Sequence, residues 1–191
     1  MIYRGARLSL CPKVYPPSDD SFLLADNIHV EGGERVLDLG TGCGIQGIIA
    51  SKMGGVVTSA DINREALKCA RRNAELNGTD ISFITSDLFE GTEGEFDLIM
   101  FNPPYLPAEP IDRDDELRMS WEGGDTGREI TDRFIKEVEG HLSEAGRVLL
   151  IQSSMSMPKN TSPFTRCGLT GEVIDEKPLF FEKLYLYMAR R

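Results

Sequence analysis

Short apolar runs alternate with helical patterns along most of this chain, and this alternation constrains the fold more than any other feature. Five runs read as strands, at residues 35–39, 56–61, 81–85, 96–101 and 147–152. Helical patterns lie at 44–53 and 64–77, and a third follows Thr126. Because the strand runs are almost continuously apolar, they predict a parallel sheet covered by helices on both faces.

Two further runs, 171–176 and 183–189, are joined by a short connection. Such a pair predicts an antiparallel hairpin at one edge of the sheet. The predicted fold is therefore α/β: a three-layer α/β/α sandwich around a seven-stranded, mostly parallel, Rossmann-like sheet with an antiparallel C-terminal hairpin. Residues 153–168 are poor in helix formers and contain two prolines, which predicts that a helix after the fifth strand is short or missing.

The length of 191 residues suits one domain with a substantial core, which we expect to span residues 1–191. Residues 1–17 read as an irregular arm. Ser18 is a candidate N-cap of a short helix with Asp19 and Asp20 in its first turn. A long irregular stretch, 102–125, is of the kind that is usually functional or disordered.

Composition excludes several classes of protein. The formal net charge is −10, which disfavours tight autonomous binding to the phosphates of DNA or RNA. No apolar run approaches the roughly 20 residues that span a membrane. The N-terminus does not resemble a secretory signal peptide, so we expect a cytoplasmic protein.

The four cysteines, Cys11, Cys43, Cys69 and Cys167, are widely scattered. No C-x-x-C pair or Cys/His cluster suggests a metal site, and none is predicted. In a reducing cytosol such cysteines are expected to be free thiols, buried or half-buried.

A glycine-rich loop, Asp38 to Gly44, lies between the first strand and the first helix of the alternation. Glycines at 40, 42 and 44 let the backbone approach a ligand closely and permit positive φ. Asp61 ends the second strand, where an acid is suited to bind ribose hydroxyls, and Asp87 follows the third. All these features fall at the carboxyl ends of parallel strands, where open α/β sheets bind ligands.

The spacing alone permits a dinucleotide or S-adenosylmethionine (SAM). The loop departs from G-x-G-x-x-G, and the carboxylate of Asp38 precedes it. An acid at this place resembles the SAM loop of class I methyltransferases, where it lies near the methionine end of the cofactor. A cationic sulfonium tolerates nearby acids, whereas a pyrophosphate does not.

The sequence FNPPY, Phe101 to Tyr105, follows the fourth strand. The two prolines fix φ and supply no N–H, and Pro103 keeps Asn102 out of the helical region. The Asn102 side-chain oxygen and a nearby carbonyl can grip both hydrogens of an –NH2 group, and Tyr105 can pack against a planar amide or base. Transfer from a sulfonium methyl is then mainly a problem of positioning and electrostatics.

At this point the sequence resembles the amino-methyltransferases of the class I SAM-dependent superfamily, which share [ND]-P-P-[YFW]. Two stretches narrow the resemblance: VYPPSDDSFLLADNI, 14–28, and WEGGDTGREITDRF, 121–134. Both are similar to blocks of the HemK-type release-factor glutamine methyltransferases, in their short eukaryotic and archaeal branch. Bacterial members carry an extra N-terminal helical domain that this sequence does not show.

The resemblance implies a SAM-dependent protein-glutamine N5-methyltransferase acting on the Gly-Gly-Gln motif of a translation release factor, with S-adenosyl-L-homocysteine as product. It implies that Asn102 and Pro103 hold the glutamine amide, with Pro104 and Tyr105 completing the catalytic motif. The N-terminal segment 1–30 would close over the cofactor, and 102–125 would face the substrate. The implied cofactor-binding residues are Tyr15, Asp20, Ser21, Asp38, Gly40, Thr41, Gly42, Gly44, Asp61, Ile62, Asp87, Leu88 and Asn102.

The short form also resembles members that pair with a small zinc-binding activator subunit, which would form a heterodimer by docking at the sheet edge beyond the third strand. Residues 106–120 are rich in acids. They are either a solvated loop or a substrate-facing flap that would repel nucleic acid and attract a basic protein surface.

Two other functions stay open. One is a nucleic-acid amino-methyltransferase acting on N6 of adenine or N2 of guanine, which would need a basic surface and usually a recognition domain. The other is a non-catalytic SAM-binding protein, which the intact NPPY motif argues against.

Overall fold

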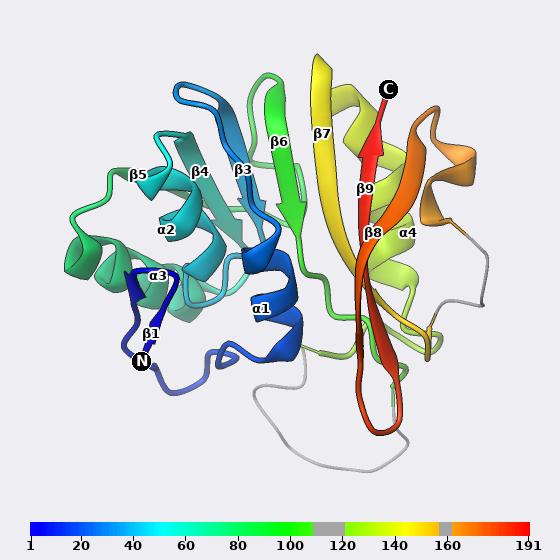
Figure 1. The fold of residues 1–191 in the computed structure, drawn as a ribbon, viewed down its shortest axis with the longest axis horizontal. Coiled ribbons are helices and arrows are strands. Elements are labelled where there is room, and N and C mark those ends of the chain that lie inside the picture. The colour runs from blue at the N-terminus through cyan, green and yellow to red at the C-terminus, as the bar shows by residue number, and fades with distance from the viewer. Residues whose placement is uncertain (109–120, 157–161) are drawn as a thin grey trace.

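A seven-stranded sheet forms the centre of the computed structural model, which describes residues 1–108, 121–156 and 162–191 (Figure 1). The strands lie in the order β5-β4-β3-β6-β7-β9-β8. Their bounds are β3 (Arg35–Leu39), β4 (Val56–Asp61), β5 (Ile81–Thr85), β6 (Phe96–Phe101), β7 (Leu142–Ser153), β8 (Thr170–Pro178) and β9 (Lys183–Arg190). The first five are parallel and β9 is antiparallel to both its neighbours, so the predicted topology is confirmed.

Helices pack against both faces of the sheet. The helices α1 (Asp19–Asp26), α2 (Ile45–Lys52) and α3 (Arg64–Asn77) contribute to one buried apolar cluster, with Leu24, Ile48 and Cys69 among its members. The helix α4 (Glu129–Glu137) contributes Phe134 to a second cluster. These two clusters are the apolar layers on either side of the sheet, as expected for strands that are apolar on both faces.

Local sequence signals fix α3 as predicted. The Asn63 side chain accepts a hydrogen bond from Glu65 N at 2.9 Å, and Gly78 ends the helix with φ of 62°. An N-cap acceptor and a left-handed glycine satisfy the terminal backbone groups of a helix. Ser18 is also at the predicted N-cap position of α1, but its side chain makes no capping hydrogen bond.

The segment after Thr126 differs from expectation. The Glu129 carboxylate accepts from Thr126 N at 3.0 Å, but α4 begins only at Glu129. A 3₁₀ turn, η2 (Val138–His141), follows, and β7 starts at Leu142, five residues before the predicted strand. Leu142 pairs with Phe96 beside a register shift, so contacts between distant segments make β7 longer than its apolar run predicts.

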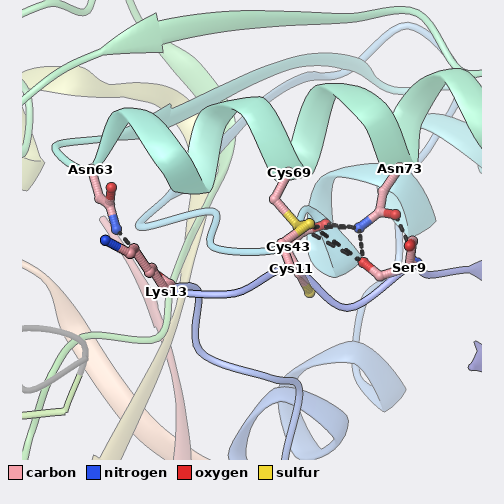
Figure 2. The surroundings of a disulfide bond; sticks show 7 residues. All are labelled: Ser9, Cys11, Lys13, Cys43, Asn63, Cys69 and Asn73. Carbon is pink, nitrogen blue, oxygen red and sulfur yellow. Dashed lines mark hydrogen bonds between the residues drawn. A yellow bond between two sulfur atoms is a disulfide. The ribbon is translucent and has the colours of Figure 1, made fainter. Parts of the chain in front are cut away.

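The N-terminal arm is more ordered than predicted. Two short strands, β1 (Ile2–Tyr3) and β2 (Ala6–Arg7), form a hairpin. The arm then runs along α3, where Ser9 N donates to the Asn73 side chain at 2.8 Å (Figure 2).

A disulfide joins Cys11 of the arm to Cys69 of α3 across a sequence separation of 58 (Figure 2). The expectation of four free thiols is therefore wrong for these two residues, while Cys43 and Cys167 are free and buried. The spacing in the sequence gives no sign of the pairing because only the folded arm brings Cys11 beside α3.

The stretch between β7 and β8 has one helical element among its described residues, the 3₁₀ turn η3 (Pro163–Arg166). This short turn agrees with the prediction that a helix after the fifth predicted strand is short or missing. Within the described parts of the chain, no helix is both long and apolar enough to span a bilayer.

Candidate functional site

A cavity of about 890 Å³ opens at the carboxyl ends of β3, β4 and β6. In Figure 1 the arrowheads of these strands point to one end of the sheet, beside α1. This is the edge at which doubly wound sheets bind ligands, and the volume is in the usual range for a cofactor site. Every predicted site residue except Gly44 lines the cavity: Tyr15, Asp20, Ser21, Asp38, Gly40, Thr41, Gly42, Asp61, Ile62, Asp87, Leu88, Asn102, Pro103, Pro104 and Tyr105.

The loop after β3 brings backbone to the cavity. Gly40 and Gly42 have φ of 61° and 54°, backbone angles that residues with a side chain rarely adopt. A Cβ on Gly40 would also meet the Phe101 ring at 3.4 Å. Gly44 has a different place: a Cβ there would meet Ala70 of α3 at 3.1 Å, so this glycine permits helix packing and does not line the cavity.

Asp38 holds the loop in shape. Its carboxylate accepts hydrogen bonds from Thr41 Oγ1 at 2.5 Å and from Gly47 N at 3.1 Å. Only 2% of the residue is exposed, and burial raises the pKa of its carboxyl to about 7. Asp38 therefore organises the glycine loop and presents a group that can gain charge when a cation is placed nearby.

Asp61, at the end of β4, is also bound to backbone. Its carboxylate accepts from Gly42 N at 3.0 Å and from Asn63 N at 2.8 Å, while burial raises its pKa. A carboxylate has about four acceptor sites, so acceptor capacity remains for a ribose hydroxyl.

Asp87 has a partner that the sequence did not indicate. Arg133 of α4 donates to its carboxylate at 2.9 Å, and this hydrogen bond raises the pKa of the Arg133 guanidinium. Both residues line the cavity. The neighbouring Leu88 has φ of 48°, a left-handed conformation for a residue with a branched side chain, so this turn is held in an unusual shape beside the cavity.

The Asn102 side-chain oxygen is buried and has no hydrogen-bond partner among the described residues. Buried polar atoms are nearly always paired, and an exception in a cavity wall points to a ligand donor. Asn102 follows β6 directly, and the prolines after it cannot donate from the backbone. The arrangement therefore leaves one buried acceptor without a donor, which an –NH2 group can supply.

Tyr105 ties this motif to α1. Its hydroxyl donates to the Asp20 carboxylate at 3.0 Å, and Asp20 is 4% exposed. Burial and the Asp20 charge raise the pKa of Tyr105, and burial raises that of Tyr15 to about 12. Both tyrosines are therefore neutral hydroxyls at physiological pH, and the N-terminal segment is attached to the wall of the cavity that holds Asn102.

The glycine block 121–127 packs against the backbone of the NPPY segment. Leu106 N donates to Trp121 O, and Gly123 N donates to Leu106 O, both at 2.9 Å. A Cβ on Gly123 would lie 2.5 Å from Pro104 O, and one on Gly127 would lie 2.5 Å from Tyr105 O. The glycines permit a close backbone contact that fixes the segment carrying Asn102. Residues 109–120, which include most of the predicted acidic flap, lie outside the described residues.

Comparisons with known proteins identify the family. The model of the methyltransferase small domain matches residues 18–118. A putative protein N5-glutamine methyltransferase of Methanocaldococcus jannaschii is 40% identical over 98% of this chain and 96% of its own. The chain belongs to the HemK-type methyltransferase family.

Other family members support this assignment. Human methyltransferase HEMK2 is 34% identical, over 76% of this chain and 74% of its own length. The Mtq2 chain in the E. cuniculi Mtq2–Trm112 complex, which methylates the eRF1 translation termination factor, superposes with a TM-score of 0.73 at 26% identity. That match covers 94% of this chain and 99% of the other.

This HemK-type methyltransferase is a SAM-dependent enzyme, and its cavity suits the cofactor. The glycine loop leaves room for close approach of a ligand, and Asp61 retains acceptor sites for ribose hydroxyls. Asp38 and Asp20 are carboxylates in the wall of the same cavity, where a sulfonium and an ammonium are tolerated.

Proposed function

We propose that this enzyme methylates the side-chain amide nitrogen of the glutamine in the Gly-Gly-Gln motif of a translation release factor. The observation that carries the proposal is the unpaired, buried side-chain oxygen of Asn102 in the cavity wall. A primary amide offers two N–H donors on a planar nitrogen, which is the partner that this acceptor lacks.

The proposed roles follow from the placement of each group. Asn102 accepts one amide hydrogen, and the Pro103 carbonyl is proposed to accept the other. When bound, SAM supplies an electrophilic methyl group. The two acceptors orient the amide and increase electron density on its nitrogen, which gains the methyl group and afterwards loses a proton.

The same proposal assigns the cofactor contacts. Asp61 would bind the ribose, Asp87 the adenine amino group, and the loop from Gly40 to Gly42 the methionyl part. Gly44 would not contact the cofactor; it would only permit α3 to pack closely, because it lies next to Ala70. The chain would act as one domain, 1–191, which the single continuous seven-stranded sheet supports.

A nucleic-acid acceptor is the weaker alternative. The net charge of −10 opposes phosphate binding, and several acids, including Glu65, Glu122 and Glu182, line the cavity. The protein glutamine acceptor also agrees with the names of the relatives. A release-factor substrate would place the activity in the cytoplasm.

We also propose that a small activator subunit pairs with this chain. The E. cuniculi relative is found in a complex with Trm112. The proposal that the partner of this chain binds zinc rests on the family resemblance alone. The docking edge would be β5, the outermost parallel strand, where Ile81, Phe83 and Ile84 are only partly buried.

One assay tests the proposed substrate. The enzyme, co-expressed with its activator, is incubated with radiolabelled SAM and three acceptors: a release factor, its Gly-Gly-Gln variant with Ala for Gln, and duplex DNA. We expect label on the first acceptor alone. Label on DNA and none on the factor would refute the proposal.

A further inference from the structure

The turn between β8 and β9 presents two phenylalanines to solvent. Phe180 is 93% exposed and Phe181 is 87% exposed, and their rings pack edge to face with centroids 4.6 Å apart. Single exposed apolar residues are ordinary, but adjacent aromatic rings at the tip of a hairpin are typical of a contact surface. We call these two residues the aromatic tip.

The base of the turn is fixed. Leu179 N donates to Glu182 O at 2.8 Å, which closes the turn. Lys183 N donates to Ser154 Oγ at 2.9 Å, and Ser154 N donates back to Lys183 O at 2.9 Å. The aromatic tip is therefore held in a defined position, and its exposure does not come from a frayed strand end.

The same turn is part of the cavity wall. Leu179, Glu182 and Leu184, which flank the aromatic tip, all line the cavity. Figure 1 shows the hairpin at the end of the sheet to which β6 points, extending beyond the end of β7. The Glu182 charge also contributes to raising the pKa of Tyr105, so this wall is close to the NPPY motif.

Charge restricts what could cover this surface. The chain carries a net charge of −10, and Glu182 lies in the neighbouring cavity wall, where Asp19 is paired with Lys177 at 2.6 Å. The net negative charge repels nucleic acid and anionic membrane surfaces, whereas a protein face with basic and apolar residues is attracted.

We propose that the aromatic tip docks the folded body of the protein substrate, on a basic and apolar face beside the loop that carries the acceptor glutamine. The inference rests on the proposed function. A free amide or a short side chain fits inside the cavity, so only a large substrate would reach a tip that projects outside it. The aromatic tip would then select an intact protein through binding, separately from the chemistry at Asn102.

The test measures binding and transfer with the double variant F180S/F181S in complex with its activator. Binding to a release factor whose Gly-Gly-Gln glutamine is replaced by alanine removes any contribution of the acceptor amide. We expect the Kd for this factor, and the KM for the unmodified factor, to rise at least tenfold. The kcat and the Kd for SAM should stay within twofold of wild type.

Two control variants accompany it. Val173→Ser removes a half-exposed apolar side chain from β8 away from the turn and should behave as wild type. F180L/F181L keeps an apolar tip and should restore most of the binding. An unchanged Kd and KM in F180S/F181S would overturn the inference while leaving the proposed function intact. No transfer to the factor by the wild-type complex would instead refute the proposed function, and the inference with it.

Two further outcomes would also overturn the inference. Wild-type binding to phosphatidylcholine–phosphatidylserine vesicles that F180S/F181S loses would assign the aromatic tip to a membrane. If light scattering gave a doubled mass for the wild-type complex but not for F180S/F181S, the aromatic tip would be assigned to a contact with a second copy of this chain.

Discussion

The Asn102 side-chain oxygen is the residue-scale feature on which the proposed chemistry depends, because it is a buried acceptor in the cavity wall without a described partner. Asn102→Ala should lower kcat/KM for the release factor by about 10²–10³-fold, the range seen when one preorganised polar contact to a reacting group is lost. The Kd for SAM, measured by calorimetry, should change little.

A matched variant sharpens this prediction. Asn102→Asp keeps an acceptor oxygen at the same place and should retain more activity than Asn102→Ala. Equal loss of SAM binding and of transfer in Asn102→Ala would mean that Asn102 serves the cofactor and not the acceptor amide.

Asp38 gives a second residue-scale prediction, on pH. Its pKa is raised from 3.8 to about 7 in the folded protein. Below about pH 4 the carboxyl is neutral in both states, and as pH rises toward 7 the unfolded state ionises first. The contribution of Asp38 to the free energy of unfolding is therefore lost between these values.

Asp38→Asn isolates this effect, because it keeps an acceptor for Thr41 and Gly47 but cannot ionise. Urea unfolding from pH 4 to pH 8 should show wild type losing stability relative to the variant as pH rises. Parallel curves for the two proteins would contradict a raised pKa at Asp38. Asp61, whose pKa is also raised, is present in both proteins, so the two curves differ only through Asp38 and its electrostatic coupling to Asp61.

At the scale of elements, the contact between the glycine block and NPPY positions the proposed acceptor site. Gly127 has φ of 73°, and a Cβ there would meet Tyr105 O at 2.5 Å. Gly127→Ala should therefore displace the backbone that follows Asn102 and lower kcat/KM at least tenfold, with a much smaller change in the Kd for SAM.

The control for this prediction is Gly140→Ala, since a Cβ at Gly140 meets nothing within 4 Å. It should leave kcat/KM within about twofold. Full activity in Gly127→Ala would show that the close contact does not position the acceptor site.

The sequence predicted the elements whose signals are local. Strands β3, β4, β5 and β6 and helix α3 have the predicted bounds. Their signals are local: each strand is an apolar run, and α3 has a capping residue directly before and after it. Most site residues gather because they end or follow a parallel strand, whereas Tyr15, Asp20 and Ser21 come from the N-terminal arm and α1. The early start of β7 at Leu142 and the Arg133–Asp87 pair escaped prediction, because both depend on contacts between distant segments.

At the scale of the whole molecule, the disulfide holds the arm, and Lys13 and Tyr15 within it, against the body that forms the cavity. A disulfide typically stabilises the folded state by about 2–4 kcal/mol, mainly by restricting the unfolded chain. The double variant C11S/C69S should lose about that much in chemical unfolding under non-reducing conditions.

The same measurement in a strong thiol reductant is the control, where wild type and C11S/C69S should unfold alike. A difference that persists after reduction would mean that the two side chains stabilise the fold by packing. The arm escaped prediction for the same physical reason as the disulfide: its partners, such as Asn73, are far away in the sequence.

The central claim is that the methyl group goes to a glutamine side-chain amide. Tandem mass spectrometry of a release factor, after incubation with the enzyme, its activator and SAM bearing a deuterated methyl group, tests it most directly. The account predicts one labelled methyl group on the amide nitrogen of the Gly-Gly-Gln glutamine. A methyl group found only on another residue of the factor would contradict it.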